Sequence, residues 1–184
     1  MKRTLDLLLS LVGLLLLWPL MLLTAIAIAV ESGRPVLFVH QRVGRGGRQF
    51  GMLKFRSMVK NAAAIGPYHT DSNDPRITRV GRFIRRTSLD ELPQLLNVVR
   101  GDMSLVGPRP DVPAQRANYS EHDWNERCSV CPGITGLAQA RLRSHATPAQ
   151  RLALDLQYVR ERGMALDLRI LGWTMARLGG RGST

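Results

Sequence analysis

Two adjacent carboxylates, Asp90 and Glu91, lie within a strongly basic stretch at residues 78–110, TRVGRFIRRTSLDELPQLLNVVRGDMSLVGPRP. The arginines that precede and follow them are Arg79, Arg82, Arg85, Arg86, Arg100 and Arg109. Carboxylates among guanidinium groups are typical of sites that handle phosphate, because arginine binds phosphate oxygens in bidentate fashion. This stretch is therefore the first candidate for a catalytic site.

The residues around the acidic pair predict an amphipathic helix. Apolar residues recur at helical spacing: Leu89, Leu92, Leu95, Leu96 and Val99. Because Pro93 is tolerated only in a first helical turn, we expect the N-cap between Ser88 and Asp90. Asp90 would then lie at the positive end of the helix dipole, which favours an ionised carboxylate and attracts phosphate. In the structural alternative, Ser88-x-x-Glu91 is a capping box that only starts the helix.

Residues 34–56 predict a β-hairpin. A β-branched and aromatic run at 36–39 is followed by a glycine-rich turn at 44–47 and a return strand at 50–55. The turn lacks the G-x-x-x-x-G-K-[ST] pattern of a phosphate loop. In a regular strand Lys54 and Arg56 point to the same face, which is either a phosphate-binding face or a solvated one.

The rest of the chain predicts a loop and further helices. Residues 61–75 are polar and contain two prolines, so they predict a loop. Arginines then recur at every third position from 76 to 85 and would form one basic stripe on a helix. Residues 111–127 and 147–163 predict helices, the second starting at Thr147-Pro148. A last helix is expected from about Asp167, either lying on a membrane surface or packed into the core.

Residues 7–30 form an uncharged, largely apolar run that, as a helix about 36 Å long, is long enough to cross a bilayer. A signal peptide is one alternative, but the run is too long for it. A spanning helix is the second alternative. Both flanks of the run are basic, and Trp18-Pro19 interrupts the helix near its middle. We therefore expect residues 5–30 to enter the bilayer and return to the same face.

The chain has 184 residues and a formal net charge of +12, and its 26 basic residues are 23 arginines and 3 lysines. This length fits one domain with an appendage. A strongly basic chain suits nucleic acid, anionic lipid or nucleotide partners. The aromatic content of 5% is low for base stacking, and no nucleic-acid-binding motif is present. Cys128 and Cys131 have no second cysteine pair beside them, so we expect reduced thiols rather than a zinc site.

The run SLDELPQLLNVVRGDMSLVGPRP resembles the signature of the bacterial sugar transferase family, the small monotopic phosphoglycosyl transferases. Three further stretches resemble the same family in the same order: Gln41-Arg42-Val43-Gly44 with Lys54-Phe55-Arg56-Ser57-Met58, then Pro132-Gly133-Ile134-Thr135-Gly136, then Asp155-x-x-Tyr158-Val159 with Asp167-Leu168. The resemblance covers nearly the whole chain. It implies an α+β protein with an N-terminal re-entrant membrane helix, a small β-hairpin and several amphipathic interfacial helices around a compact cytosolic domain.

The resemblance implies an enzyme that moves a sugar-1-phosphate from a UDP-sugar to polyprenyl (undecaprenyl) phosphate and releases UMP, which initiates the assembly of a glycan such as an exopolysaccharide, O-antigen, capsule or glycoprotein glycan. It implies that Asp90 is the nucleophile of a covalent phosphosugar intermediate. Glu91 would help to hold Mg²⁺, or Mn²⁺, together with Asp90, or would orient the lipid phosphate. Phosphate and nucleotide contacts are expected from Lys54, Arg56, Arg85, Arg109, Arg143, Gly133 and Thr135.

We expect a membrane-inserted helix at residues 1–32 and a cytosolic catalytic domain at 33–184, on the cytoplasmic face of the bacterial inner membrane. The chain departs from the family pattern at Trp18, where serine is frequent, at Cys131, where a basic residue is frequent, and at Leu137, where an aromatic residue is common. The last two departures bear on the nucleotide pocket. The sequence leaves open the sugar and whether the chain forms a homodimer.

Two other functions compete with this interpretation. A membrane-anchored binder of anionic lipid or nucleic acid would explain the charge and the apolar segment, but not the acidic pair within the basic stretch. A metal-dependent phosphatase with an aspartyl-phosphate would explain Asp90, but the second aspartate that such sites carry two residues further along is absent. UMP release that requires both a UDP-sugar and a lipid phosphate separates the three functions.

Overall fold

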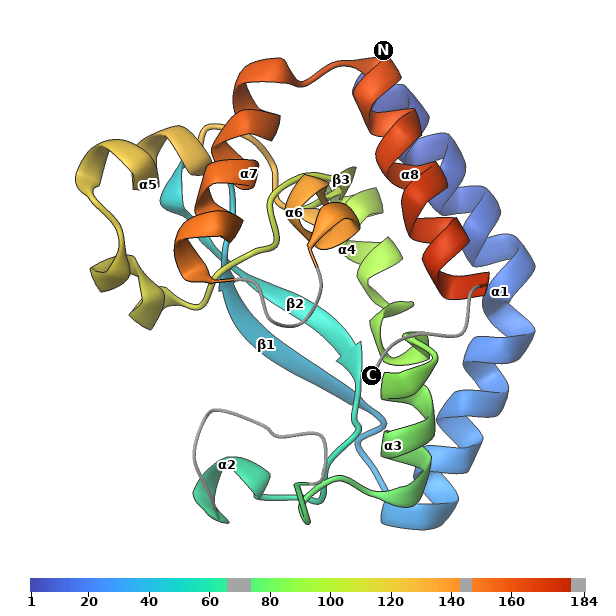
Figure 1. The fold of residues 1–184 in the computed structure, drawn as a ribbon. Coiled ribbons are helices and arrows are strands. Elements are labelled where there is room, and N and C mark those ends of the chain that lie inside the picture. The colour runs from blue at the N-terminus through green and yellow to red at the C-terminus, as the bar shows by residue number, and fades with distance from the viewer. Residues whose placement is uncertain (66–73, 143–146, 180–184) are drawn as a thin grey trace.

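A long helix, α1 (Lys2–Ser32), forms one side of the molecule, and several elements of the rest of the chain pack against it (Figure 1). The computed structural model describes residues 1–65, 74–142 and 147–179. The other elements in chain order are β1 (Leu37–Val43), η1 (Arg45–Gly47), β2 (Gln49–Phe55), α2 (Ala62–Ile65), α3 (Arg79–Arg86), η2 (Leu89–Glu91), α4 (Gln94–Arg100), β3 (Ser104–Val106), η3 (Pro113–Asn118), α5 (Glu121–Arg127), β4 (Gly133–Thr135), α6 (Leu137–Arg141), α7 (Pro148–Glu161) and α8 (Met164–Gly179). The predicted mixture of helices and a small sheet behind a long apolar helix is confirmed.

Within the described ranges, α1 is the one helix that is long and apolar enough to cross a membrane by length and composition. Its outward side exposes a row of large apolar side chains: Leu8, Leu9, Leu11, Val12, Leu15, Leu16, Trp18, Leu20, Leu22, Leu23, Ile26 and Val30. The predicted interruption at Trp18-Pro19 is wrong, because the helix continues through Pro19; it bends along its length instead (Figure 1). A bend is the expected effect of a proline that removes one backbone hydrogen bond from the helix.

The N-terminal end of α1 is attached to the body by polar contacts. Lys2 Nζ pairs with the buried carboxylate of Asp167 in α8 at 2.7 Å. The buried Asp6 accepts a hydrogen bond from Ser104 Oγ at 2.8 Å and another from the backbone N–H of Leu105 at 3.1 Å. Arg3 donates to two carbonyls in the last turn of α4, where a cation complements the helix dipole.

The C-terminal end of α1 is attached to the same body. The carboxylate of Glu31 accepts hydrogen bonds from the first two N–H groups of α3, those of Arg79 at 2.8 Å and Val80 at 3.0 Å. Arg56, which follows β2, donates to the carbonyl of Ser32 at 2.9 Å. Both ends of the apolar helix are therefore held by one globular unit.

The hairpin is confirmed, with β1 and β2 paired antiparallel along their whole length and the glycine-rich turn at η1. Met52 on β2 packs against Val98 of α4. The fully buried Asn97 of α4 accepts a hydrogen bond from the N–H of Leu53 and donates to the carbonyl of Gly51, both at 2.9 Å. Apolar packing and one bidentate amide therefore fix α4 against β2.

The predicted start of the central helix is wrong. Residues 89–91 form a single 3-10 turn, η2, and α4 begins at Gln94 with Pro93 at its N-cap. Ser88 adopts a left-handed conformation at φ 58°, and its side chain caps no backbone N–H, so the capping-box alternative is wrong as well. The proline has no N–H to donate and therefore fits at the start of α4 rather than one turn inside a longer helix.

The predicted basic stripe is correct only within α3. Arg76 lies before the helix, where it is buried and pairs with Asp74 at 2.6 Å. Thr78 starts α3 by accepting a hydrogen bond from the N–H of Gly81 at 2.8 Å. The predicted loop at 61–75 contains the short helix α2, and residues 66–73 lie outside the described residues.

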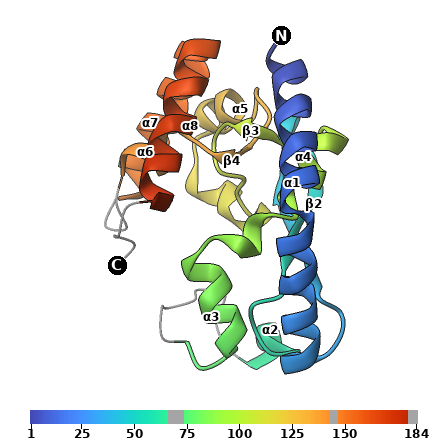
Figure 2. The same ribbon diagram turned by 90° about the vertical axis from the view of Figure 1, so that its right-hand side faces the viewer.

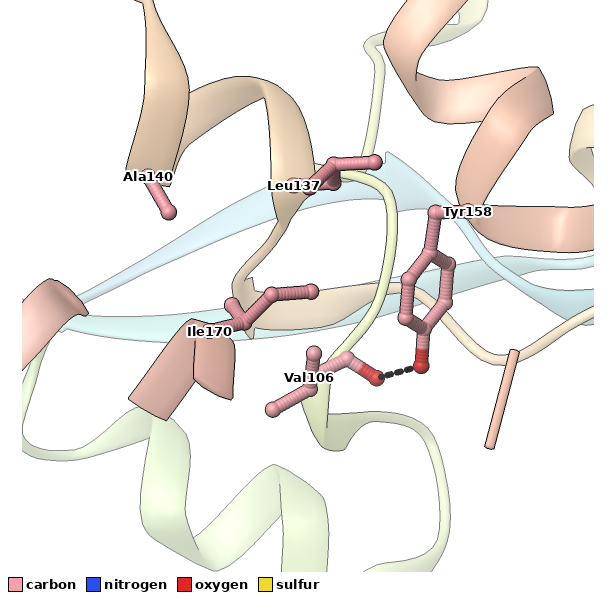
Figure 3. Packing of buried hydrophobic residues seen from close by; sticks show 5 residues of the cluster. All are labelled: Val106, Leu137, Ala140, Tyr158 and Ile170. Atoms are coloured by element: carbon pink, nitrogen blue, oxygen red, sulfur yellow. Dashed lines mark hydrogen bonds between the residues drawn. The ribbon is translucent and has the colours of Figure 1, made fainter. Parts of the chain in front are cut away.

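The second half of the chain packs around a separate apolar cluster (Figure 3). Its buried members are Val106, Leu137, Ala140, Tyr158 and Ile170. The short strands β3 and β4 pair in parallel beside this cluster. The predicted helix at 111–127 is divided into η3 and α5, which the extended residue Tyr119 separates from each other.

The two last helices agree with the predictions in part. Thr147 starts α7 as predicted, by accepting a hydrogen bond from the N–H of Gln150. The last helix starts at Met164, three residues before Asp167. Packing of α8 into the core is confirmed at Ile170, which is fully buried, while residues such as Leu168 expose their apolar side chains, so contact of α8 with a membrane surface stays a prediction. Figure 2 faces the side of the molecule that carries α1, α3 and α8.

We predict that Gly81→Ala destabilises the protein by about 1–3 kcal/mol, because overpacking forces neighbouring atoms to move. A Cβ at position 81 would lie 1.9 Å from the carbonyl oxygen of Ser57. Gly172→Ala in α8 is the matched control, because a Cβ at position 172 would meet no atom within 4 Å and alanine favours helix. Thermal unfolding in detergent measures both variants. Equal melting temperatures for the two would contradict the packing of α3 on Ser57.

Candidate active site

The acidic pair is held in the turn η2, between α3 and α4. Ser88, directly before this turn, has the left-handed conformation that non-glycine residues rarely adopt. Backbone conformations of this kind persist where the surrounding structure imposes them, and they cluster at functional sites. Asp90 is buried, with 7% of its surface exposed. The chain therefore places a carboxylate in a protected position on an unusual turn.

Glu91 joins three separate segments of the chain. Its Oε1 lies 2.7 Å from Lys54 Nζ of β2 and 2.7 Å from Arg109 Nη2, which comes from the loop after β3. Burial alone would raise the pKa of Glu91, but the charges of Arg109 and Lys54 and their hydrogen bonds outweigh burial and lower the pKa to about 2. Glu91 is therefore an ionised carboxylate at neutral pH, and two cations share its charge.

Asp90 has a different environment from its neighbour. Among the residues that the structure describes, its nearest cation is Lys54, whose Nζ lies 3.8 Å from Asp90 Oδ2, beyond hydrogen-bonding distance. Burial raises the pKa of Asp90, and the charges of Lys54, Arg85 and Arg109 oppose that rise only in part. Adjacent carboxylates with pKa values shifted in opposite directions are typical of acidic pairs that divide two chemical roles.

Arg85 completes the basic surroundings of this turn. It comes from the last turn of α3, and its Nε donates to Ser57 Oγ at 2.7 Å. Its charge lowers the pKa of Asp90, which agrees with a position near that carboxylate. Of the predicted phosphate-binding residues, the structure thus gathers Lys54, Arg85 and Arg109 around the acidic pair. Arg143 lies outside the described residues.

Arg56 is placed elsewhere. Strand β2 ends at Phe55, and the guanidinium group of Arg56 is buried against the end of α1, where it donates to the carbonyl of Ser32 at 2.9 Å and its hydroxyl at 2.8 Å. Lys54, by contrast, extends to Glu91. The two side chains that a regular strand would place on one face therefore reach different parts of the molecule.

The Pro132–Gly136 motif lies behind the loop that carries Arg109. A Cβ at Gly133 would lie 2.1 Å from the backbone nitrogen of Gly107, so this position requires glycine for the close approach of β4 to the loop. Thr135 is buried, and its hydroxyl lies 2.7 Å from the hydroxyl of Thr174 in α8. Leu137 is part of the apolar cluster in Figure 3. In this structure the Pro132–Gly136 motif packs against the loop that carries Arg109 and supports it.

One group that the sequence interpretation missed is Arg127 at the end of α5. It is buried between Asp111 and Asp155, and it also donates to the carbonyl of Arg109. The Asp155-x-x-Tyr158 motif was the only sequence signal near it, and nothing in the spacing connects residue 127 with residue 109. The predicted free thiols are confirmed, since Cys128 and Cys131 form no disulfide.

The acidic pair offers oxygen donors suited to a hard cation such as Mg²⁺. In residues 1–65, 74–142 and 147–179, no group of three or more His, Cys, Asp or Glu side chains gathers as a metal site. Among these described residues, Asp90 and Glu91 therefore supply only part of a coordination shell. This fits Mg²⁺, which usually keeps water ligands and binds through one or two carboxylates together with substrate phosphates.

The chain is similar to known proteins over nearly its whole length. The model of the family described as bacterial sugar transferase matches residues 1–180. Over 187 residues the chain is 44% identical to an undecaprenyl-phosphate glucose phosphotransferase of Komagataeibacter xylinus, covering 96% of this chain and 35% of that protein. Over 186 residues it is 43% identical to an exopolysaccharide production protein, PSS, of Rhizobium leguminosarum bv. phaseoli, covering 95% of this chain and 93% of that protein.

A third relative is a UDP-glucose:undecaprenyl-phosphate glucose-1-phosphate transferase of Caulobacter vibrioides, 42% identical over 184 residues that cover 96% of this chain and 69% of that protein. The chain spans only 39% of the length of several other curated relatives that it matches, as it spans 35% of the Komagataeibacter protein. The family match nevertheless extends over nearly all of its residues. The chain therefore belongs to the bacterial sugar transferase family.

Proposed function

We propose that this protein transfers a sugar-1-phosphate from a UDP-sugar to polyprenyl phosphate and releases UMP, as the first step of glycan assembly. The observation that carries the proposal is the acidic pair itself. Asp90 is buried and has no cation within hydrogen-bonding distance among the described residues, whereas Glu91 is paired with both Lys54 and Arg109. The family match and the activities named for the relatives point to the same reaction class.

In the proposed mechanism a carboxylate oxygen of Asp90 attacks the β-phosphorus of the UDP-sugar. A new bond forms between that oxygen and the phosphorus, the bond from the phosphorus to the bridging oxygen breaks, and UMP leaves with the bridging oxygen. A phosphate oxygen of polyprenyl phosphate then attacks the same phosphorus and displaces Asp90. The raised pKa of Asp90 supports this role, because a carboxylate that is poorly stabilised as an anion is the stronger nucleophile.

The cations around the pair would stabilise the negative charge on the transferring phosphoryl group. Lys54 and Arg109 both contact Glu91, so that carboxylate holds two positive groups beside Asp90 without itself carrying uncompensated charge. Arg85 adds a third positive group from α3. We propose that Glu91 acts as the residue that positions these cations.

We further propose that Asp90 and Glu91 hold Mg²⁺ together with the substrate. Lys54 and Arg109 both donate to Oε1 of Glu91, so neither of these contacts uses Oε2, the oxygen proposed to face the ion. When bound, the ion would neutralise charge on the diphosphate of the donor. Since two carboxylates make an incomplete shell, we expect the metal to bind tightly only when the diphosphate contributes further oxygens.

We propose that α1 is re-entrant and that the active site lies on the cytoplasmic face of the plasma membrane. A spanning helix would place its two ends on opposite sides of an apolar layer about 30 Å thick. Here Lys2 and Asp6 at one end, and Glu31 at the other, contact the same globular unit. The exposed apolar row of α1 lies between them and is suited to the bilayer interior. A lipid phosphate and a cytosolic UDP-sugar could then meet at one surface.

We predict that Asp90→Asn lowers turnover at least about a thousandfold while the protein stays folded, because the amide is isosteric but not nucleophilic. UMP release is measured with UDP-glucose, UDP-galactose and UDP-N-acetylgalactosamine, the sugars for which relatives are named. Asp102→Asn is the matched control, since the Asp102 carboxylate accepts a hydrogen bond from Asn97 and is not part of the acidic pair. Near-normal turnover of Asp90→Asn would exclude Asp90 as the nucleophile.

A second prediction follows from the proposed covalent intermediate. Wild-type protein incubated with the UDP-sugar alone should release about one equivalent of UMP and gain one phosphosugar on the peptide that contains Asp90, because the first displacement needs no lipid. Mass spectrometry of the digested protein detects the adduct. If even the first equivalent of UMP is released only when both substrates are present, a direct transfer replaces this mechanism.

The metal proposal predicts that EDTA abolishes turnover and that Mg²⁺ or Mn²⁺ restores it, whereas zinc does not. Mn²⁺ binding followed by electron paramagnetic resonance should be weak for the protein alone, strong with UDP present and lost in Glu91→Gln. The double variant Cys128→Ser/Cys131→Ser should keep its activity, because these thiols are free and lie in a separate motif. Full activity in EDTA is the result that rules the metal out.

The membrane proposal is tested by single cysteines at Thr4 and Arg34, which are both exposed, in the Cys128→Ser/Cys131→Ser background. A membrane-impermeant thiol reagent added to intact cells should label neither position, and both should be labelled in inside-out vesicles. A cysteine at the exposed Arg48 in the hairpin turn marks the cytosolic side. Labelling of position 4 but not position 34 from outside would show that the helix spans.

A further inference from the structure

The loop at residues 107–111 delivers Arg109 to Glu91, and its backbone is bonded along its whole length. The N–H of Gly107 donates to the carbonyl of Thr135 at 2.9 Å, and the carbonyl of Pro108 accepts from Gly133 at the same distance. The carbonyl of Pro110 accepts from Arg42 Nη1 at 2.9 Å. This loop is therefore fixed by β4 on one side and by the hairpin on the other.

The carbonyl of Arg109 itself is held by one buried side chain, Arg127. Its Nη2 donates to that carbonyl at 2.6 Å, its Nη1 to Asp111 Oδ2 at 2.5 Å, and its Nε to Asp155 Oδ2 at 2.9 Å. Arg127 is 7% exposed, and its guanidinium group also lies over the ring of Tyr119 at 5.6 Å. The planar fork of arginine makes these three contacts at once, which lysine, with a single ammonium group, does not reproduce.

Helix α7 holds both ends of this loop. Asp155 orients Arg127, and three residues later, on the same side of the helix, Tyr158 donates to the carbonyl of Val106 at 3.0 Å, just before the loop begins (Figure 3). The two motif residues that the mechanism leaves without a role, Asp155 and Tyr158, thus both act on the segment that carries Arg109.

If Arg127 served only to join α5 to α7, it would not need to contact the loop that carries Arg109. Helices α5 and α7 are already joined at the surface by Glu126 and Arg160, at 2.7 and 2.9 Å. A buried pair of charges is weak as a source of net stability, because desolvation offsets most of the attraction. What distinguishes Arg127 from Arg160 is its contact with the backbone of Arg109.

We propose that Arg127, oriented by Asp155, is a positioning residue that fixes Arg109 against Glu91 and thereby sets the rate of phosphosugar transfer. This inference rests on the proposed function. Arg127 acts through Arg109 and touches no reacting atom. Its loss should therefore lower kcat, and it should matter only while the side chain of Arg109 is present.

A double-mutant cycle tests the inference. Arg127→Lys should lower kcat about 10- to 100-fold, because small displacements of a catalytic group have effects of this size, while the KM for the UDP-sugar changes by less than about threefold. In an Arg109→Ala background the same substitution should change the residual kcat by less than about threefold, because coupled residues are not additive. Asp155→Asn, which removes one charge and keeps the shape, should show the same pattern with a smaller loss.

The matched control is Arg160→Gln, which breaks the surface pair between the same two helices and does not touch the loop. It should leave kcat within about twofold of wild type. Equal losses from Arg127→Lys in both backgrounds, or an unchanged kcat in the Arg109-containing protein, would overturn the positioning role. A wild-type protein that releases no UMP with any donor would instead overturn the proposed function, so the two failures are distinct.

Discussion

The shared contact of Lys54 and Arg109 with one oxygen of Glu91 is the interaction on which the site depends. It connects the hairpin, the turn after α3 and the loop after β3, three segments that are far apart in sequence. A carboxylate buried beside a second carboxylate is unfavourable unless cations compensate it. The structure meets that requirement at Glu91 and leaves the burial cost on Asp90, whose raised pKa follows from the same arrangement.

The need to keep these cations in place explains much of the surrounding architecture. Asn97 locks the strand that carries Lys54 against α4, and Gly133 allows β4 to approach the loop that carries Arg109. One apolar cluster, which contains Val98, packs α4 against β2. A second cluster, which contains Tyr158, packs against β3, just before the loop that carries Arg109. The geometry of the candidate site is thus a result of packing between elements and not of any single motif.

The sequence is informative where chemistry and local structure are encoded together. The acidic pair, the flanking arginines and the hairpin can all be predicted, because a motif or a turn specifies them locally. The actual start of α4 at Gln94 cannot be predicted in this way, because the left-handed conformation of Ser88 depends on the contacts that surround η2. The side chains of Lys54 and Arg56 contact different parts of the molecule because β2 ends between them, at Phe55, and the sequence does not predict that end.

The role of Arg127 is likewise hidden from sequence. Its partners lie 16, 18 and 28 residues away, and no periodic pattern relates them. In the sequence, the charges at the start of α1 indicate only membrane orientation. In the folded protein Lys2 and Asp6 are partners of buried groups, which the balance of charge on either side of an apolar run does not reveal.

These attachments mean that the apolar helix is a structural part of the folded protein, in addition to the membrane role proposed for it. Asp167 is 3% exposed and is neutralised by Lys2, so a chain shortened before the hairpin would leave a buried carboxylate without its cation. It would also free the first N–H groups of α3 from Glu31 and the guanidinium group of Arg56 from Ser32. Removing α1 to make the protein soluble would therefore destabilise the fold. A detergent used to purify the protein has to keep α1 together with the rest of the chain.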